Sequence, residues 1–339
     1  MKVLLILIFF VSIFLISIFA TRSSERFSER FSERFENRDR DELNKMIVDI
    51  NNFIMKKGVN KIKMPIYYIN MDKNPDRNEF MKNQLNQYST NYTRIKGFNG
   101  YEIKNKLNDT VDDISFIIDK TYNNMEKAEI GCTMSHLIAM KTSYENGDDI
   151  ALIIEDDTMV HLASLNDFDE IINNAPYNWE IIQLSCFNWD FNKILLHPNK
   201  ILLNHNESQE DFLYYKYVSP YYFNSTVGYI INRKGMKKIL DHTYKGEVGK
   251  NNSPLFYIGP NNFSQSGEVM PHTGVADYFI YDLTNTYVLY PNIFYANNID
   301  LESTIHTSHT DLHISRSLEI VKQHHNKIKK FINLDKINE

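Results

Sequence analysis

Three consecutive carboxylates, Glu155, Asp156 and Asp157, follow directly on the apolar run Ala151–Ile154. An unbroken apolar run of this length is typical of a central strand that is buried on both faces. Isolated carboxylates are costly to remove from water, so three of them at the end of such a strand indicate a nearby counter-charge. Ligands of open α/β sheets bind at the carboxyl ends of strands, and hard oxygen ligands select Mg²⁺ or Mn²⁺. The triplet therefore predicts a divalent-cation site in a cleft; the alternative is an acidic surface loop.

The elements that must position this triplet begin with a β-α-β unit. Lys63–Asn70 and Tyr92–Phe98 have the composition of strands, and Asn74-Pro75 provides the N-cap and first position of a helix between them. Strands joined in this way run parallel. Further helices are predicted at Glu129–Tyr144, Asn166–Asn174, Arg233–Leu240 and Ala276–Leu283, and further strands at Trp179–Cys186, Ser225–Asn232 and Thr286–Tyr290.

Two long stretches show no periodicity. They are Asn188–Phe212 and Gly246–Pro271, and their composition predicts loops. Since specificity residues are concentrated in loops, these stretches are expected to determine substrate specificity.

The chain begins with an uncharged stretch, Val3–Ala20, that is just long enough to cross a bilayer as a helix. A cleavable signal peptide is the other interpretation, but its apolar region is normally shorter. We therefore expect a single-pass signal-anchor with a luminal body of the ER/Golgi type, or a secreted or luminal protein if the segment is cleaved. Glycosylation sequons give weak support to this location; they begin at Asn91, Asn108, Asn206, Asn224, Asn251 and Asn262.

The predicted organisation has four parts: residues 1–21 as anchor or signal peptide, 22–60 as stem, 61–310 as the catalytic domain and 311–339 as a helical or polar tail. The stem holds three SERF repeats and an amphipathic helix at Asp41–Lys56. That helix either packs onto the body or pairs two stems as a short coiled coil, which makes a homodimer possible. A chain that starts near Asn60 is expected to be soluble and active.

Bulk composition excludes several classes of protein. The balance of 43 acidic to 37 basic residues gives a net charge of −6, which disfavours nucleic-acid binding. A hydrophobic fraction of 42% indicates a globular body. Two cysteines, Cys132 and Cys186, are too few for a disulfide scaffold. They are expected to be two buried free thiols, and the alternative is that they pair with each other.

Six blocks in order resemble glycosyltransferase family 25, which includes bacterial lipooligosaccharide galactosyltransferases and animal procollagen galactosyltransferases. Together they span roughly residues 62–306. One departure is Asn99, which stands where the family usually has an aspartate. The blocks are IYYINMDKNPDR (Ile66–Arg77), IKGFNG (Ile95–Gly100), AEIGCTMSHLIAMK (Ala128–Lys141) with LIIEDD (Leu152–Asp157), STVGYIINRKGMKKIL (Ser225–Leu240), ADYFI (Ala276–Ile280) and LESTI (Leu301–Ile305).

The resemblance implies a GT-A glycosyltransferase fold, Rossmann-like, with a mostly parallel sheet flanked by helices behind the membrane anchor. It also implies inverting transfer of a hexose, galactose first and glucose next, from a UDP-sugar with Mn²⁺ or Mg²⁺. The acceptor is expected to be a glycan, a glycoprotein or the hydroxylysine of a collagen-like chain. A catalytically silent glycan-binding glycoprotein and a metal-dependent phosphohydrolase are the competing functions. The intact acidic triplet argues against the first, and the lack of a two-metal cluster of His and Asp argues against the second.

Several residues then receive roles. Asp157 is the first choice for metal ligation, with Asp156 or Glu155 contacting the ribose or a metal-bound water. The remaining donor-site candidates are Asn70, Arg77, Ser135 and His136. Arg77 has the alternative of a solvated helix residue, and His136 that of a satisfied core histidine.

Two candidates lie late in the chain. Inverting transfer needs a carboxylate that deprotonates the acceptor hydroxyl, and Asp277, at the start of a predicted helix, is the best candidate. Its alternative is an aspartate that only complements the helix dipole. His306 is expected to complete the metal sphere, as a late histidine does in many GT-A enzymes, or else to be a polar tail residue.

Overall fold

The computed structural model describes residues 40–58, 60–89, 91–186, 213–217, 225–260, 274–297, 317–326 and 328–329. Within these ranges no helix combines the length and the apolar character needed to cross a membrane. The expected anchor Val3–Ala20, the SERF repeats, the predicted loop Asn188–Phe212 and His306 lie outside the described residues.

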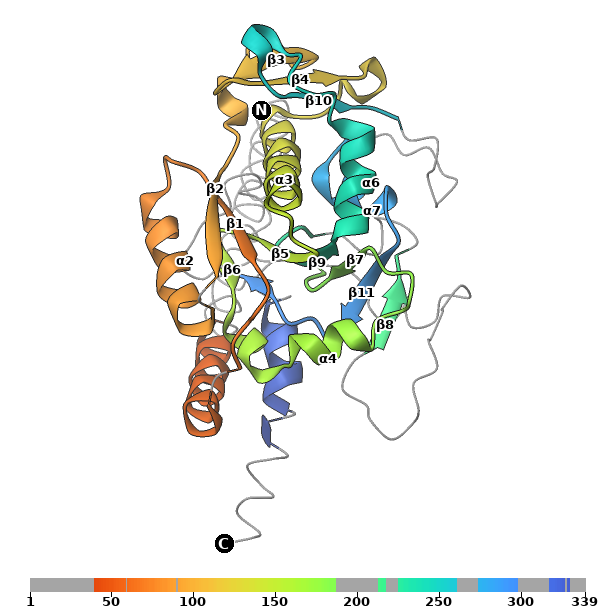
Figure 1. Cartoon of the computed structure of the whole chain (residues 1–339). Coiled ribbons are helices and arrows are strands. Elements are labelled where there is room, and N and C mark those ends of the chain that lie inside the picture. Colours follow the sequence, from red (N-terminus) through yellow and green to blue (C-terminus); the bar gives the residue numbers. More distant parts are fainter. Residues whose placement is uncertain are drawn as a thin grey trace, which may run out of the picture.

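The centre of the molecule is a seven-stranded mixed sheet (Figure 1). Strands β2, β1, β5, β7 and β11 run in one direction, whereas β9 and β8 run in the opposite one. The predicted parallel β-α-β start is confirmed. The inverted strand β9 lies between β5 and β7, so the middle of the sheet is antiparallel. In sheet order the strands are β2 (Tyr92–Lys96), β1 (Ile66–Asn70), β5 (Ile150–Glu155), β9 (Gly228–Asn232), β7 (Ile181–Gln183), β11 (Thr286–Tyr290) and β8 (Leu213–Lys216).

Both faces of this sheet are covered by helices. One face packs against α3 (Lys127–Asn146), α6 (Arg233–Thr243) and α7 (Ala276–Asp282), and the other against α2 (Pro75–Tyr88) and α4 (Phe168–Asn173). All five helices were predicted from the sequence, with ends that differ by a few residues. The layered arrangement is visible in Figure 1, where α3 and α6 lie side by side over the sheet.

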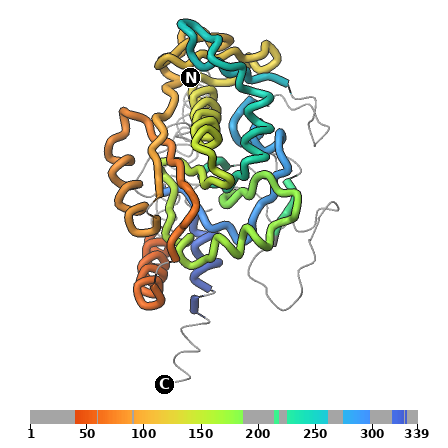
Figure 2. The backbone as a smooth tube through the Cα atoms, viewed as in Figure 1, coloured from red at the N-terminus to blue at the C-terminus, as the bar shows by residue number. Residues whose placement is uncertain are grey.

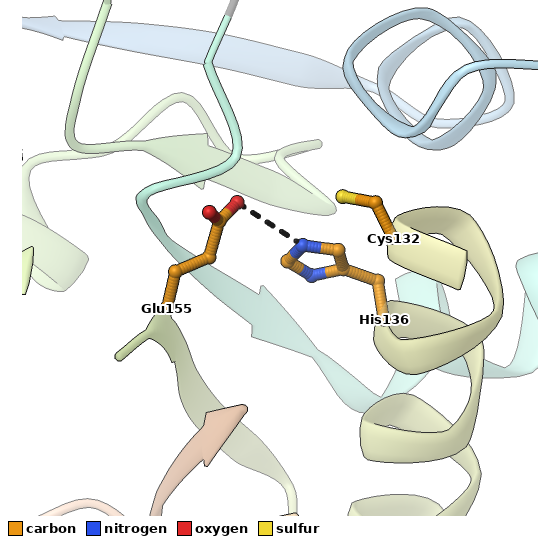
Figure 3. A group of neighbouring side chains, drawn as sticks. All are labelled: Cys132, His136 and Glu155. Atoms are coloured by element: carbon orange, nitrogen blue, oxygen red, sulfur yellow. Dashed lines mark hydrogen bonds and ion pairs between the residues drawn. The ribbon is translucent and has the colours of Figure 1, made fainter. Parts of the chain in front are cut away.

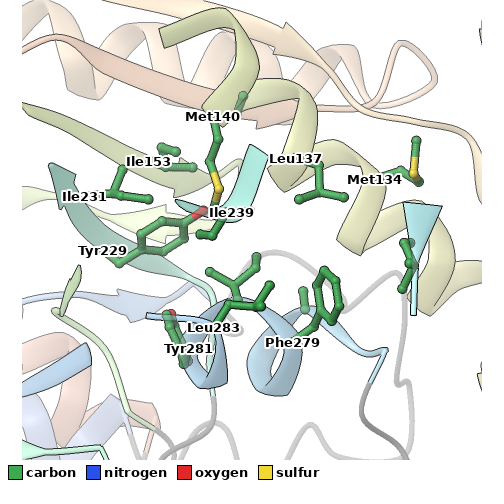
Figure 4. Packing of buried hydrophobic residues seen from close by; sticks show 14 of the residues in the cluster. Met134, Leu137, Met140, Ile153, Tyr229, Ile231, Ile239, Phe279, Tyr281 and Leu283 are labelled. Atoms are coloured by element: carbon green, nitrogen blue, oxygen red, sulfur yellow. The ribbon is translucent and has the colours of Figure 1, made fainter. Parts of the chain in front are cut away.

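Strand β5 shows why its apolar run is unbroken. Successive side chains of a strand point to opposite faces, so Ala151 and Ile153 join the cluster under α3, while Leu152 and Ile154 join the cluster under α2 and α4. Figure 4 shows the first of these clusters, where the side chain of Ile153 lies near residues of α3 and β9. All four side chains are completely buried, as predicted for a central strand.

A second, three-stranded sheet was not predicted. It consists of β3 (Asn108–Val111), β4 (Ile114–Ile118) and β10 (Leu255–Ile258) in the order β10-β4-β3. The prediction of a loop throughout Gly246–Pro271 is therefore wrong at β10. Four residues are too few to show a period, and the partner strand β4 lies about 140 positions earlier in the chain.

The remaining short elements connect these layers. They are the 3₁₀ turns η1 (Gly100–Glu102), η2 (Lys120–Tyr122), η3 (His161–Leu165) and η4 (Lys250–Asn252), and the paired strands β6 (Thr158–Met159) and β12 (Tyr295–Ala296).

The predicted amphipathic helix of the stem forms over residues 40–57 and packs onto the body. Its apolar face, formed by Leu43, Met46, Ile50 and Ile54, is buried. The side chains it contacts come from η3, β12 and the helix at residues 317–326, so the two ends of the described chain lie side by side (Figure 2). The face that a coiled-coil pair of stems would use is therefore occupied by the body.

This packing generates a prediction about truncation. A chain that starts at Asn60 loses four buried side chains, each worth roughly 1.5–3 kcal/mol, and it exposes their apolar partners. It should unfold at a clearly lower urea concentration than the full chain, or aggregate. A chain that starts at Asn37 keeps the helix and serves as the control. Equal urea midpoints for the two truncated chains would show that the helix is dispensable, as the sequence had suggested.

Candidate functional site

The acidic triplet lies in a cleft at the carboxyl end of β5. Glu155 is the last residue of the strand, and Asp156 and Asp157 form the turn that follows it. The cleft is bounded by the end of β1, the start of α2, the turn after β2 and the first half of α3. Its lining residues are Ile69, Met71, Lys73, Asn74, Arg77, Phe98, Gly100, Tyr101, Ala128, Gly131, Cys132, Ser135, His136, Glu155, Asp156 and Asp157.

Two glycines allow the turn after β2 to lie directly on α3. A Cβ atom at Gly100 would come within 1.9 Å of the carbonyl oxygen of Lys127. A Cβ atom at Gly131 would lie 2.9 Å from the backbone of both Phe98 and Gly100. The turn is further held by Asn99, whose side chain accepts a hydrogen bond from the backbone N–H of Tyr101 (3.2 Å). An aspartate would make the same contact, so the departure from the family pattern at Asn99 preserves the turn.

Both carboxylate oxygens of Asp156 have partners in the protein, although burial still raises the pKa of this carboxyl. One carboxylate oxygen accepts a hydrogen bond from Nη1 of Arg77 (2.7 Å), and the other accepts one from Nδ2 of Asn70 (2.7 Å). Arg77 and Asn70 are both buried, so this is an ion pair removed from water. The structure thus places both residues beside the triplet, and Arg77 is not the solvated helix residue of the alternative interpretation.

The position of Arg77 follows from the start of α2. Pro75 occupies the first helical position, which places Arg77 in the first turn facing the end of β5. Asn74 precedes the helix as predicted, but its side chain makes no capping hydrogen bond. Its carbonyl oxygen instead accepts a hydrogen bond from Nδ2 of Asn70 (3.1 Å).

Arg94, on β2, orients the Asn70 amide. Its Nε donates to Oδ1 of Asn70 (2.9 Å), which turns Nδ2 toward Asp156. Arg94 also pairs with Asp72 at 2.6 Å. Arg94 was not among the residues predicted from the sequence. It could have been recognised as a charged residue on the strand that pairs with the strand carrying Asn70.

Asp157 is the least compensated member of the triplet. Its Oδ1 is buried and has no hydrogen-bond partner in the part of the chain that the structure describes, and its Oδ2 lies 3.6 Å from Nη1 of Arg77. Burial and repulsion by Glu155 and Asp156 raise the pKa of Asp157 to about 7, although Arg77 opposes this shift. An unpartnered buried carboxylate oxygen fits a hard divalent cation, which would supply the missing positive charge.

Glu155 is bound by two side chains from other elements. It accepts a hydrogen bond from Thr226 (2.6 Å), and Nε2 of His136 lies 3.4 Å from the same oxygen. Burial opposes ionisation, but these contacts and Arg77 hold the pKa of Glu155 below its ordinary value. His136 is fixed from its other side by the hydroxyl of Tyr229, 3.0 Å from Nδ1. His136 is thus buried, as in the alternative interpretation, and also faces the triplet.

Ser135 lies at the cleft wall but uses its hydroxyl within the protein. Its Oγ donates to the carbonyl oxygen of Gly131 (2.6 Å) and accepts from the backbone N–H of Phe98 (2.8 Å). These bonds join the turn after β2 to α3. The geometry gives Ser135 a role in shaping the cleft. Its predicted contact with the sugar-nucleotide donor stays a prediction.

Thr226 connects Asp277 to the triplet. Asp277 lies in the first turn of α7, and its Oδ1 is 3.2 Å from Oγ1 of Thr226. Burial and the charge of Glu155 raise the pKa of Asp277 to about 6. Among the described residues, those that line the cleft do not include Asp277; its side chain is partly exposed and is linked to Glu155 through Thr226.

Thr226 was also not among the residues predicted from the sequence. Its neighbour Ser225 has a φ of 130°, a region that residues other than glycine rarely adopt. The carbonyl oxygen of Ser225 accepts hydrogen bonds from Gln183 (2.9 Å) and Tyr281 (2.8 Å), which stabilise this conformation. The Thr226 hydroxyl lies two positions before β9. It reaches the carboxyl end of β5 only because β9 runs antiparallel to β5, which the sequence does not show.

Comparison with known protein families identifies the family of this chain. No curated protein matches the chain. A family model, described as glycosyltransferase family 25 (LPS biosynthesis protein), matches residues 63–251. The matched segment covers the elements from β1 to α6, and it includes the triplet, Asn70, Arg77, Ser135, His136 and Thr226. Since the match covers more than half of the chain, the protein belongs to glycosyltransferase family 25.

Proposed function

We propose that this glycosyltransferase moves a hexose, galactose first and glucose second, from a UDP-sugar to an acceptor hydroxyl with inversion. The observation that carries the proposal is the unpartnered oxygen of Asp157, buried in a cleft at the carboxyl end of β5. Asp157 would be the main ligand of Mn²⁺ or Mg²⁺. Asp156 and His306 would be the further protein ligands of the metal. When bound, the cation neutralises charge that develops on the departing UDP.

The other residues of the site would orient the acidic triplet and deprotonate the acceptor hydroxyl. Arg77 and Asn70 hold Asp156 in place, and Arg77 adds positive charge on the side where the diphosphate would lie. Asp277 takes the proton of the acceptor hydroxyl as that oxygen attacks the anomeric carbon from the face opposite UDP. A carboxylate with a pKa of about 6 is suited to this task near neutral pH, since it is ionised and still basic.

The acceptor and the location belong to the same proposal. A glycan, a glycoprotein or a hydroxylysine of a collagen-like chain supplies the hydroxyl. Val3–Ala20 would hold the catalytic body at a membrane, on the luminal side, or be removed during secretion. Incubation with Mn²⁺ and a panel of UDP-sugars, with UDP release as the measurement, tests the donor. A protein that releases UDP from none of them and still binds glycans would be the catalytically silent alternative.

The first prediction concerns the cation. Asp157→Asn keeps the size of the side chain and removes the charge, so transfer and Mn²⁺-dependent binding of UDP should be abolished while the fold is retained. Calorimetry with UDP, with and without Mn²⁺, measures the binding. Asp113→Asn, on the exposed turn between β3 and β4, is the control and should behave as the wild type. Full activity of Asp157→Asn would remove the basis of the proposal.

The second prediction concerns charge compensation in the cleft. Arg77→Met leaves the buried Asp156 carboxylate without the guanidinium group that pairs with it. Such a loss typically lowers the free energy of unfolding by about 3–5 kcal/mol. Adding Asp156→Asn removes the stranded charge, so the double variant should recover much of that loss. Urea denaturation of the wild type, both single variants and the double variant measures the coupling. Additive effects would mean that the pair is not coupled.

The third prediction concerns the base. Asp277→Asn should lower turnover by a factor on the order of 10²–10⁴, the range that general-base catalysis supplies. UDP-sugar affinity should barely change, because the interaction is made mainly in the transition state. In the wild type, kcat/KM should rise with pH through about 6 as the Asp277 carboxyl loses its proton, and the variant should lack this rise.

The matched control is Asp282→Asn, at the other end of the same helix. It should keep wild-type turnover. If Asp277→Asn is fully active and Asp282→Asn is not, the base is Asp282. Loss of UDP-sugar binding in Asp277→Asn would move that residue to the donor site.

A further inference from the structure

The wall of the cleft carries a second group of ligand atoms, separate from those of Asp156 and Asp157. Cys132 and His136 lie four residues apart on α3, so they share one face of the helix, and Glu155 faces them from the end of β5 (Figure 3). The Sγ, imidazole nitrogen and carboxylate oxygen all lie within 4.8 Å of one another. All three residues line the cleft, so an ion that enters it reaches them.

The chemistry of this group differs from that of the triplet. Thiolate, imidazole and carboxylate together are the donors that Zn²⁺ accepts, whereas Mg²⁺ and Mn²⁺ prefer oxygen alone. We propose that Cys132, His136 and Glu155 form a binding site for a Zn²⁺-class cation. Three protein ligands leave a fourth, open position toward the cleft for a water molecule, as in zinc sites that keep an exchangeable ligand.

Two neighbouring hydroxyl groups already orient the ligands. Tyr229 lies 3.0 Å from Nδ1 of His136, which leaves Nε2 directed at Glu155. Thr226 donates to the Glu155 carboxylate at 2.6 Å. Partners of this kind fix the ring orientation of a histidine ligand and the position of a carboxylate ligand. The imidazole and the carboxylate are thereby held facing each other, 3.4 Å apart, on the cleft wall beside Cys132.

Binding requires a small closure and the loss of one proton. Tetrahedral Zn²⁺ ligands lie roughly 3–4 Å apart, given metal–ligand bonds of about 2.0–2.3 Å, so the widest pair must approach by about 1 Å. Rotation of the short Cys132 side chain supplies this movement. The thiol exchanges its proton for the cation, so a sulfur–metal bond forms as the S–H bond breaks and the proton leaves to solvent.

The experiment uses Co²⁺ as a spectroscopic substitute for Zn²⁺ on the purified full chain. Wild-type protein should show thiolate-to-cobalt charge-transfer absorption in the near ultraviolet, and Zn²⁺ should abolish it. This absorption reports a cysteine ligand, so histidines elsewhere in the chain do not produce it. Because the measurement needs no sugar transfer, failure of the proposed function leaves it unaffected.

Variants separate this site from other thiols. Cys132→Ser should lose the charge-transfer absorption, and Cys186→Ser, the matched control, should keep it. Thr226→Val should retain the absorption but bind Co²⁺ about 10–100-fold more weakly, the loss usual when a hydrogen-bond partner of a ligand is removed. Absence of the absorption in the wild type, or its persistence in Cys132→Ser, would overturn the proposal.

A measurement on the wild type alone covers the case in which Cys132→Ser fails to fold. Zn²⁺ should slow the alkylation of Cys132 by iodoacetamide, with the modified peptide identified by mass spectrometry, and Mg²⁺ should leave the rate unchanged. Equal alkylation rates of Cys132 with and without saturating Zn²⁺ would contradict the site.

Discussion

The concentration of negative charge at the end of β5 is the constraint on which the rest of the site depends. Glu155, Asp156 and Asp157 follow a strand whose apolar residues are buried on both faces, so their charge must be met by other elements. Arg77 and Asn70 meet it at Asp156, and Thr226 and His136 meet it at Glu155. Among the described residues, Oδ1 of Asp157 has no hydrogen-bond partner. Asp157 is therefore the carboxylate of the triplet whose charge is least offset, and this is the reason for proposing a cation there.

The packing of the body determines which groups reach the triplet. Gly100 and Gly131 let the turn after β2 lie against α3, which brings His136 to the cleft wall. The reversed direction of β9 places the residues before it, Ser225 and Thr226, at the carboxyl end of β5. A parallel strand in that position would place its other end there. Thr226 can therefore bridge Glu155 and Asp277, which come from strands and helices far apart in the sequence.

Two kinds of ligand set then lie within one cleft. Asp157 offers oxygen to a hard cation, and Cys132, His136 and Glu155 offer mixed donors to a softer one. Glu155 belongs to the second set and directly precedes the first in the chain. A cation at either place would reduce the repulsion that raises the pKa of Asp157, so occupation of the two sites is expected to be linked.

The sequence by itself indicated strand β5, the helices that flank the large sheet and the concentration of charge at the end of that strand. The apolar run of β5, Pro75 at the start of α2 and the periodicity of α3 were sufficient because each is a local pattern. Only the tertiary structure decided which side chains and strands pair with one another. The reversal of β9, the contact of Arg94 with Asn70 and the pairing of β10 with β4 join residues distant in the sequence, and no local pattern encodes them. Packing also decided that the helix at residues 40–57 lies against the body. Amphipathicity determines which face of a helix is buried, but not what covers that face.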